Sequence, residues 1–419
     1  MKINTGRGSI SLFTLLAVWS VSAVTSLPGL AISPILGDLT KIFPHVSQFK
    51  LDMLTSLPSL LIIPVMLISG KIADKGGKIK LVVAGLSIFL LSSILYFFAE
   101  SITWLILIGC LLGIGAGIVI PLSTSLIATI FDGKFRVSQL GISSSITNVT
   151  LVIATFVSGI LADINWHLPF IVYTLPVVSL ILILKAQRSD ELGKAIALGE
   201  SSGDSFAGME DEPAIKGIKP KNIARLIGIY FMITYLVLTI VFELSVMFGS
   251  EGHDSSISGT LISILFLAIM TPGLFLNKII HLLKANTNLI ATLFIVIGLF
   301  VIYFYQNVFL VTIGCVISGF GYGIMQPVIY EKATDVSTRK TTTLILGLVM
   351  SMNYFAILLF PLILQSIQYV MHMSSSRDTF LINGVIGSIF LVLLYFYRHT
   401  FSVGMEKRYY TDQSKESNN

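Results

Sequence analysis

Long runs of apolar residues, separated by short polar connections, make up most of the chain. Twelve of these runs can absorb the roughly 20 apolar residues that a membrane-spanning helix needs. They lie near residues 11–35, 50–70, 80–99, 103–130, 139–162, 168–186, 224–248, 257–276, 286–305, 307–331, 341–369 and 379–398. Their continuous Leu, Ile and Val content excludes a β-barrel, whose strands alternate over roughly ten residues. The pattern predicts an all-α membrane protein with twelve transmembrane helices.

Composition and charge support this fold class. Hydrophobic residues make up 54% of the chain and charged residues 12%, against roughly 25% charged in a soluble domain. No Lys or Arg lies inside a run away from its ends, as expected from the cost of burying a charge in hydrocarbon. The first run is longer than the apolar core of a signal peptide and lacks a small-residue cleavage site, so we expect a retained helix.

The basic residues predict the orientation. If the N-terminus is cytoplasmic, the inner connections hold 24 of the 27 Lys and Arg residues, and the outer ones hold only Lys41, Lys50 and Arg377. Short cytoplasmic loops carry such an excess in membrane proteins. We therefore expect a multi-pass protein of the inner (cytoplasmic) membrane with both termini cytoplasmic. The net charge of +5 then requires no nucleic-acid partner.

A repeated motif divides the chain into two halves. GIGAGIVIP at residues 113–121 is echoed by GFGYGIMQP at residues 319–327. Each copy lies in the fourth helix of its half, which predicts two pseudo-symmetric six-helix bundles with a substrate site at their interface. The predicted bundles are 1–186 and 224–398, joined by a cytoplasmic linker at 187–223 and followed by a cytoplasmic tail at 399–419. The linker's polar composition predicts no folded core.

The glycines of the repeat have two interpretations. Small residues recur every fourth position in both copies: Gly109, Gly113, Gly117 and Pro121 in the first, and Cys315, Gly319, Gly323 and Pro327 in the second. Small residues at this spacing let membrane helices approach closely. The same Gly and Pro residues are also typical of helices that bend around a cavity.

The connection after the second run carries a further signature, GKIADKGGKIK at residues 70–80. This segment resembles the signature that the major facilitator superfamily carries between helices 2 and 3. The twelve runs and the duplication extend the resemblance to the whole chain. The resemblance implies a conformational latch formed by Gly70, Asp74, Lys75, Gly77 and Lys78, in which Asp74 favours the N-terminal end of helix 11. The alternative is that the lysines only set the orientation.

Span 5 and the LADINWHLPF segment that follows it resemble those of the bacterial drug:proton exporter group in this superfamily. The similar residues are Ser143, Ser144, Ser145, Thr147, Asn148, Trp166, Pro169 and Phe170. Two of the group's signatures are degraded. Helix 4 has Gly109 and Leu112 where the group usually has Arg and Gln, and the helix 5 motif reads Ala154, Thr155, Ser158 and Gly159 instead of Gly-Pro and Gly-Gly.

The resemblance implies that helices 1, 4, 7 and 10 line a central cavity, while helices 3, 6, 9 and 12 face lipid. Aromatic, hydroxyl and amide groups can hold an amphipathic or cationic molecule by stacking and hydrogen bonding. The candidates for substrate contact are Trp19, Ser22, Thr25, Asn148, Tyr235, Thr239, Tyr322, Gln326, Asn353 and Tyr354. For each of them the alternative is ordinary helix packing.

Few acids lie where they could couple transport to protons. Glu243 lies inside span 7, where an acid is a functional candidate by default; the alternative is hydration at the outer mouth. Asp52 begins span 2 and is the second candidate, with an outer-surface charge as the alternative. Glu331 at the inner end of span 10 is best explained as a surface ion pair with Lys332.

The sequence favours a secondary transporter over an enzyme. We predict a monomer that exports a small organic molecule (drug-like, amphipathic or metallophore-like) against inward proton movement, with the lipid bilayer, substrate and protons as partners. The alternatives are uptake or facilitated transport of a sugar-like or organic-ion solute, a lipid flippase, or a transport-inactive membrane sensor. We expect no cofactor and no metal site, since His45, His167, His253 and His372 are scattered over outer loops.

Overall fold

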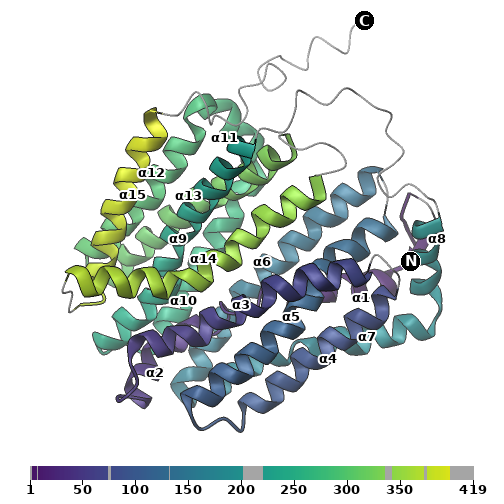
Figure 1. The fold of residues 1–419 in the computed structure, drawn as a ribbon, viewed down its shortest axis with the longest axis horizontal. Coiled ribbons are helices and arrows are strands. Elements are labelled where there is room, and N and C mark those ends of the chain that lie inside the picture. Colours follow the sequence, from purple (N-terminus) through teal and green to yellow (C-terminus); the bar gives the residue numbers. More distant parts are fainter. Residues whose placement is uncertain are drawn as a thin grey trace, which may run out of the picture. The chain divides into compact units, whose positions relative to one another are not determined.

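The computed structural model of the protein describes residues 2–6, 8–73, 77–131, 133–201, 220–335, 342–371 and 375–396. Helices make up most of it (Figure 1). They are α1 (Leu12–Val24), α2 (Leu36–Ile42), α3 (Gln48–Ala73), α4 (Lys78–Tyr96), α5 (Ile102–Ile130), α6 (Gly133–Ile164), α7 (Pro176–Arg188), α8 (Glu191–Ser201), α9 (Pro220–Ser250), α10 (Ser255–Met270), α11 (Leu276–Leu283), α12 (Thr287–Phe304), α13 (Val308–Asp335), α14 (Thr342–Met371) and α15 (Asp378–Phe396). Short 3-10 turns are η1 (Ser33–Ile35), η2 (Leu168–Thr174), η3 (Thr271–Phe275) and η4 (Lys284–Asn286).

The predicted helical membrane fold is confirmed. Eleven helical segments of the described chain are long and apolar enough to cross a membrane, and α1 is a shorter apolar helix. Together they correspond to the twelve predicted runs. The helices α3, α4 and α5 match their predicted spans to within a few residues.

Contacts divide the chain into two compact units. Unit 1 contains Met1–Ile215, Leu244–Ser263 and Ile357–Ile367, and unit 2 contains Lys216–Glu243, Ile264–Ala356 and Gln368–Asn419. In unit 1, α5 packs against α3 and α4, and α1 packs against α6 and α7. In unit 2, α12 packs against α13 and α15.

The doubled glycine motif packs in the same way in both units. A Cβ at Gly117 of α5 would lie 2.9 Å from Val65 of α3, and one at Gly319 of α13 would lie 2.6 Å from the Leu265 carbonyl of α10. Real Cβ atoms do not approach this closely, so glycine is needed at both positions. The close-packing interpretation of the repeat is confirmed, since each fourth helix meets the second helix of its own half.

The first predicted span is wrong in its continuity. Instead of one helix over 11–35, α1 ends at Val24 and the chain continues through turns into η1 and α2. Gly29 within the break has a φ of +79°, and a Cβ there would lie 2.7 Å from the Thr55 carbonyl. Pro28 cannot donate a helical hydrogen bond, and the left-handed conformation at Gly29 ends any helix.

Two local structures were not predicted. Near the N-terminus, β1 (Lys2–Asn4) pairs antiparallel with β2 (Ser9–Ser11). The predicted linker begins with the helix α8, which packs on α5, α7 and β2 near the N-terminus (Figure 1). Leu192 and Ile196, one turn apart, are buried, so the expectation of no folded core is wrong for this stretch.

Glu191 at the start of α8 binds the start of α1. Its carboxylate accepts hydrogen bonds from the Ser11 amide (2.8 Å), the Ser11 hydroxyl (2.6 Å) and the Thr14 hydroxyl (2.6 Å). These bonds, with those of Ser11 first, hold the pKa of the Glu191 carboxyl below its ordinary value of 4.5. The carboxylate thus satisfies donors at the N-terminus of α1 and fixes α8 to it.

Candidate functional site

A cluster of tyrosines in unit 2 joins α9 to α13. The Tyr230 and Tyr330 hydroxyls lie 2.8 Å apart and their rings pack edge to face at 5.6 Å. The Gln326 amide donates to both hydroxyls, at 3.3 Å and 3.4 Å. One turn along, the Tyr322 hydroxyl lies 3.3 Å from the Thr234 hydroxyl. We call these five residues the tyrosine cluster.

The cluster contains two predicted contact residues, Tyr322 and Gln326, and adds residues that the sequence analysis missed. Tyr230 and Tyr330 were not among the candidates, although Gln326 and Tyr330 are four residues apart on one helix and so share a face. Phenol rings offer a π face to a cation, and their hydroxyls can donate or accept. These are chemical groups that bind aromatic or cationic molecules, and in this structure Tyr230 is fully buried.

Tyr235 belongs to a separate network. It is 2% exposed, and its hydroxyl donates to the Asn383 carbonyl oxygen at 3.0 Å. The Asn383 amide donates in turn to the Thr239 hydroxyl at 3.0 Å. Asn383 lies on α15, which the resemblance places toward lipid, and was not predicted. In this structure, Tyr235 and Thr239 contact another helix of unit 2.

In unit 1, hydroxyl groups connect α1 to α5 and α6. Trp19 donates its indole N–H to Gln139 at 2.8 Å. The Ser22 hydroxyl lies 2.8 Å from that of Ser123 and accepts from Ser143 at 2.7 Å. Thr25 donates to the Ser22 carbonyl on its own helix. Trp19 and Thr25 are half-buried. Their side chains therefore form hydrogen bonds within the protein and still remain partly accessible.

The remaining predicted contact residues are also half-buried. Asn148 of α6 donates to the Ser144 carbonyl of its own helix at 2.9 Å. Asn353 and Tyr354 lie next to each other on α14, a half-buried part of unit 2. Contact of Asn148, Asn353 and Tyr354 with substrate stays a prediction.

Both candidate acids are buried. Glu243 on α9 is 1% exposed, and Asp52 on α3 is 3% exposed. The Gln48 amide donates to the Asp52 carboxylate at 2.9 Å. The alternative of an exposed surface charge at Asp52 is therefore wrong. The side chain of Glu331 lies outside the described residues.

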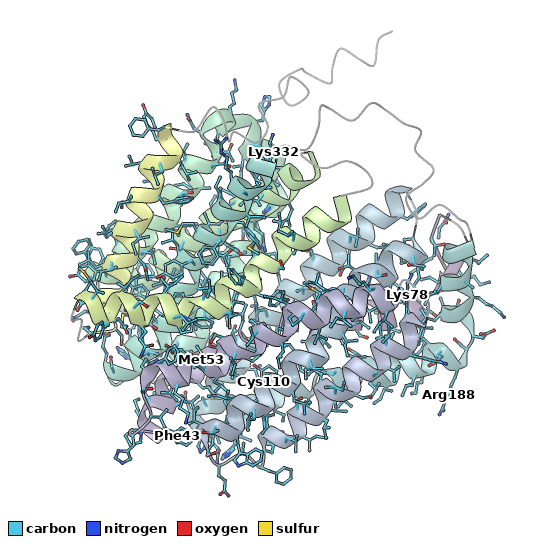
Figure 2. The ribbon with its side chains drawn as sticks, in the orientation of Figure 1. Phe43, Met53, Lys78, Cys110, Arg188 and Lys332 are labelled. Atoms are coloured by element: carbon cyan, nitrogen blue, oxygen red, sulfur yellow. The ribbon has the colours of Figure 1, made fainter. Side chains whose placement is uncertain are left out.

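The predicted latch is only partly described. Asp74 and Lys75 lie outside the described residues. Gly77 precedes α4 with a φ of +80°, a conformation that favours glycine. Lys78 donates to the Thr129 hydroxyl of α5 at 2.9 Å, and Figure 2 shows it at the same end of unit 1 as Arg188. Among the described residues, nothing lies within 4 Å of a Cβ built at Gly70.

The degraded helix 5 motif makes a close contact with α10 inside unit 1. A Cβ at Gly159 would lie 2.8 Å from the Gly259 Cα, and one at Gly259 would lie 2.8 Å from the Gly159 Cα and the Thr155 carbonyl. One turn away, the Thr155 and Ser263 hydroxyls are 2.8 Å apart. We call these four residues the glycine contact. By the predicted topology it lies toward the outer ends of spans 5 and 8.

A second close contact of glycines lies within unit 1. The Gly37 amide donates to the Ser245 hydroxyl at 3.1 Å, and that hydroxyl donates to the Pro34 carbonyl. A Cβ at Gly249 would lie 2.9 Å from the Gly37 Cα.

The described residues contain no group of three or more His, Cys, Asp or Glu side chains that could hold a metal ion.

Comparison with known proteins identifies a family. Residues 10–361 match the family model described as Major Facilitator Superfamily. A segment of 114 residues is 36% identical to the multidrug transporter protein MdtP of Bacillus subtilis, over 27% of this chain and 21% of that protein. A segment of 108 residues is 31% identical to the quinolone resistance protein NorA of Staphylococcus aureus, over 25% and 28%. The aligned segments thus span only 21% to 28% of the length of these relatives.

Solved structures are similar over nearly the whole chain. A crystal structure of a mutant of the peptide transporter POT superposes with a TM-score of 0.71 at 14% identity, covering 93% of this chain and 94% of that one. A mutant of the nucleoside transporter NupG superposes with a TM-score of 0.70 at 12% identity, covering 92% and 99%. At this identity the likeness establishes the fold.

Proposed function

Because the chain belongs to the Major Facilitator Superfamily, we propose that it exports a small organic molecule in exchange for protons. The partial similarity to MdtP and NorA, whose names refer to multidrug transport and quinolone resistance, supports export of a drug-like or amphipathic molecule. The tyrosine cluster supports an aromatic or cationic substrate. The family and the fold favour a transporter over an enzyme.

The observation that carries proton coupling is the burial of Glu243 on α9, the helix that also holds Tyr230 and Thr234. An acid inside a membrane helix is costly when charged, so its protonation depends on which side of the membrane it can reach. In this proposal the proton binds Glu243 and the substrate binds the tyrosine cluster, both on α9, in different conformational states of the transporter. Proton movement and substrate movement are thereby coupled. Asp52, buried in unit 1, is the second candidate acid.

Transport in this proposal uses alternating access of the bundles 1–186 and 224–398, joined by the linker 187–223, with the tail 399–419 and both termini cytoplasmic. The protein acts as a monomer in the inner membrane. The glycine contact, at the predicted outer ends, supports a state closed to the outside. Opening this contact is the step that releases substrate outward.

The test uses purified protein in liposomes with an imposed pH gradient. We expect tetraphenylphosphonium, a lipophilic aromatic cation, to move in the direction opposite to the downhill flow of protons. Glu243→Gln should abolish the part of this transport that depends on the pH gradient. Glu100→Gln, a matched change of an exposed acid, should behave as wild type. Gradient-independent movement of the probe, or unchanged coupling in Glu243→Gln, would refute this mechanism.

Uptake or facilitated transport of a sugar-like or organic-ion solute is the second candidate. The departures from the exporter motif at Ala154, Thr155 and Ser158 favour it. The same liposomes separate the two functions, because a facilitator equilibrates glucose or an organic ion without a pH gradient.

A further inference from the structure

Gln326 of α13 has a side-chain carbonyl oxygen that the tyrosine cluster does not use. The amide nitrogen of the same side chain lies 3.3 Å from the Tyr230 hydroxyl and 3.4 Å from the Tyr330 hydroxyl. Among the described residues, no donor bonds the Gln326 Oε1 atom. Polar groups inside a protein rarely stay without a partner, so this oxygen is suited to accept a hydrogen bond from a bound molecule.

The number of protons in the cluster decides which way the amide faces. Tyr230, Tyr330 and Gln326 form three mutual hydrogen bonds, of which the shortest joins the two hydroxyls at 2.8 Å. With the amide nitrogen facing the hydroxyls, every bond has a proton, because the amide supplies two protons and the hydroxyls supply two. With the oxygen there instead, two hydroxyl protons would have to serve three bonds. The carbonyl is therefore directed away from Tyr230 and Tyr330.

The accessible side of the cluster is formed by Gln326 and Tyr330. Both residues are half-buried, whereas Tyr230, Tyr322 and Thr234 are buried. Gln326 and Tyr330 are four residues apart on α13, so they are neighbours on one face of the helix. A molecule that reaches this face can contact the Tyr330 ring and the Gln326 carbonyl oxygen at the same time.

The groups on this face favour a cation over an anion. The only basic residue in the sequence of α13 is Lys332, near the C-terminal end of the helix (Figure 2). It is six residues beyond Gln326, which corresponds to a rotation of about 240° around the helix, so it lies on a different side. A tyrosine ring attracts a cation through its π face, and a carbonyl oxygen binds only a donor.

We propose that Gln326 selects substrates with an N–H donor on a cationic nitrogen, so that protonated aromatic amines bind in preference to quaternary ammonium ions. The ammonium N–H donates to the Gln326 carbonyl oxygen, and the aromatic part of the same molecule packs against Tyr330. A quaternary nitrogen has the same charge but no proton to donate, so it leaves the carbonyl oxygen without a partner. The inference rests on the proposed binding of substrate at the tyrosine cluster.

The test compares two probes that differ in one substituent on the nitrogen. Protonated N,N-dimethyl-1-naphthylmethylamine has the N–H donor, and 1-naphthylmethyl-trimethylammonium has a methyl group in its place. Equilibrium dialysis of the purified full-length protein in detergent at pH 7 gives the Kd of each probe, and the ratio of the two Kd values measures the preference. For wild type we expect the amine to bind about fivefold more tightly or better, because it alone forms a hydrogen bond from a charged donor.

Two variants separate selection from packing. Gln326→Met removes the amide and keeps an unbranched side chain of similar length, so the ratio should fall to about one. Thr234→Val is the matched control, since the hydroxyl that it removes bonds Tyr322 and not Gln326, and its ratio should equal that of wild type. A loss of packing weakens the binding of both probes and leaves their ratio unchanged.

The outcomes distinguish this inference from the proposed function. A wild-type ratio of about one, which requires no variant to fold, overturns the selection by Gln326, as does an unchanged ratio in folded Gln326→Met or an equal fall in Thr234→Val. If this happens while the pH gradient still drives tetraphenylphosphonium, the proposed function stands alone. A preference that is lost only in Gln326→Met, without pH-driven transport, supports the selection and rejects proton-coupled export. Binding of neither probe overturns the selection.

Discussion

The glycine contact makes the substitution Gly259→Ala a sharp test of how unit 1 is held together. The added Cβ would lie 2.8 Å from the Gly159 Cα and from the Thr155 carbonyl oxygen. Both obstacles are backbone atoms, which cannot rotate away. Restoring ordinary contact distances requires α6 and α10 to separate by about 0.7 to 1.2 Å.

This separation has a cost that can be worked out. The Thr155–Ser263 hydroxyl bond would lengthen from 2.8 Å to about 3.5 Å or more, beyond the range of such bonds. Overpacking costs about 1 to 3 kcal/mol, and an interhelical hydrogen bond contributes about 0.6 kcal/mol. The higher helix propensity of Ala stabilises the closed and the open state equally, so it does not change the equilibrium between them. A total of about 1.6 to 3.6 kcal/mol shifts the equilibrium away from the closed contact by about 15- to 400-fold.

The assay measures the opening of this contact. Ser158 next to Gly159 is fully buried, so Ser158→Cys in a background without Cys110 and Cys315 reacts with an impermeant maleimide only when the contact opens. We expect Gly259→Ala to raise the labelling rate at least tenfold. Gly141→Ala on the same helix as Gly159 is the control, since nothing described lies within 4 Å of its Cβ. Equal labelling in folded Gly259→Ala and wild type, or an equal rise in Gly141→Ala, would refute the reasoning.

Three further results are expected. Because the pKa of Glu191 is lowered, its contribution to stability is fully present above its unfolded value of 4.5 and is lost as pH falls through its folded value; thermal unfolding of Glu191→Gln between about pH 6 and pH 3 should therefore lose less stability than wild type. Tyr330→Phe removes the hydroxyl bonded to Tyr230 and should weaken tetraphenylphosphonium binding by about 1 kcal/mol, read by equilibrium dialysis. Gly77→Ala should destabilise the protein by about 1 to 2 kcal/mol in thermal unfolding, whereas Gly70→Ala should not.

Span positions and the packing of the repeat were predictable because both depend on local features. Apolar length decides where a helix can cross a membrane, and glycine spacing decides which face can approach another helix. The break after α1 was also readable in principle, since Pro28 and Gly29 interrupt the run. Their effect was missed because hydropathy averages over a window and does not register backbone conformation.

The site was less predictable, since a sequence places a residue on a helix without fixing which neighbour that face meets. Tyr235 and Tyr230 differ by five residues on α9, and only Tyr230 joins the tyrosine cluster. Helix number alone places α15 toward lipid and so predicts no polar contact for Asn383, which bonds Tyr235 and Thr239. The useful signal was chemical, since an amide inside an apolar run requires partners wherever it lies.

The degraded exporter motif shows that a sequence signature should be compared by side-chain size as well as by residue identity. Proline is missing from the helix 5 motif, yet Thr155 and Gly159 still approach α10 closely enough to exclude any larger residue at Gly159. Thr155 fills its position with a hydroxyl that bonds Ser263, which a proline could not do. The departure therefore exchanges a rigid ring for a polar bond while keeping the helices close. Loss of the motif's letters is accordingly weak grounds for rejecting exchange, and the labelling of Ser158→Cys decides whether the contact opens as exchange requires.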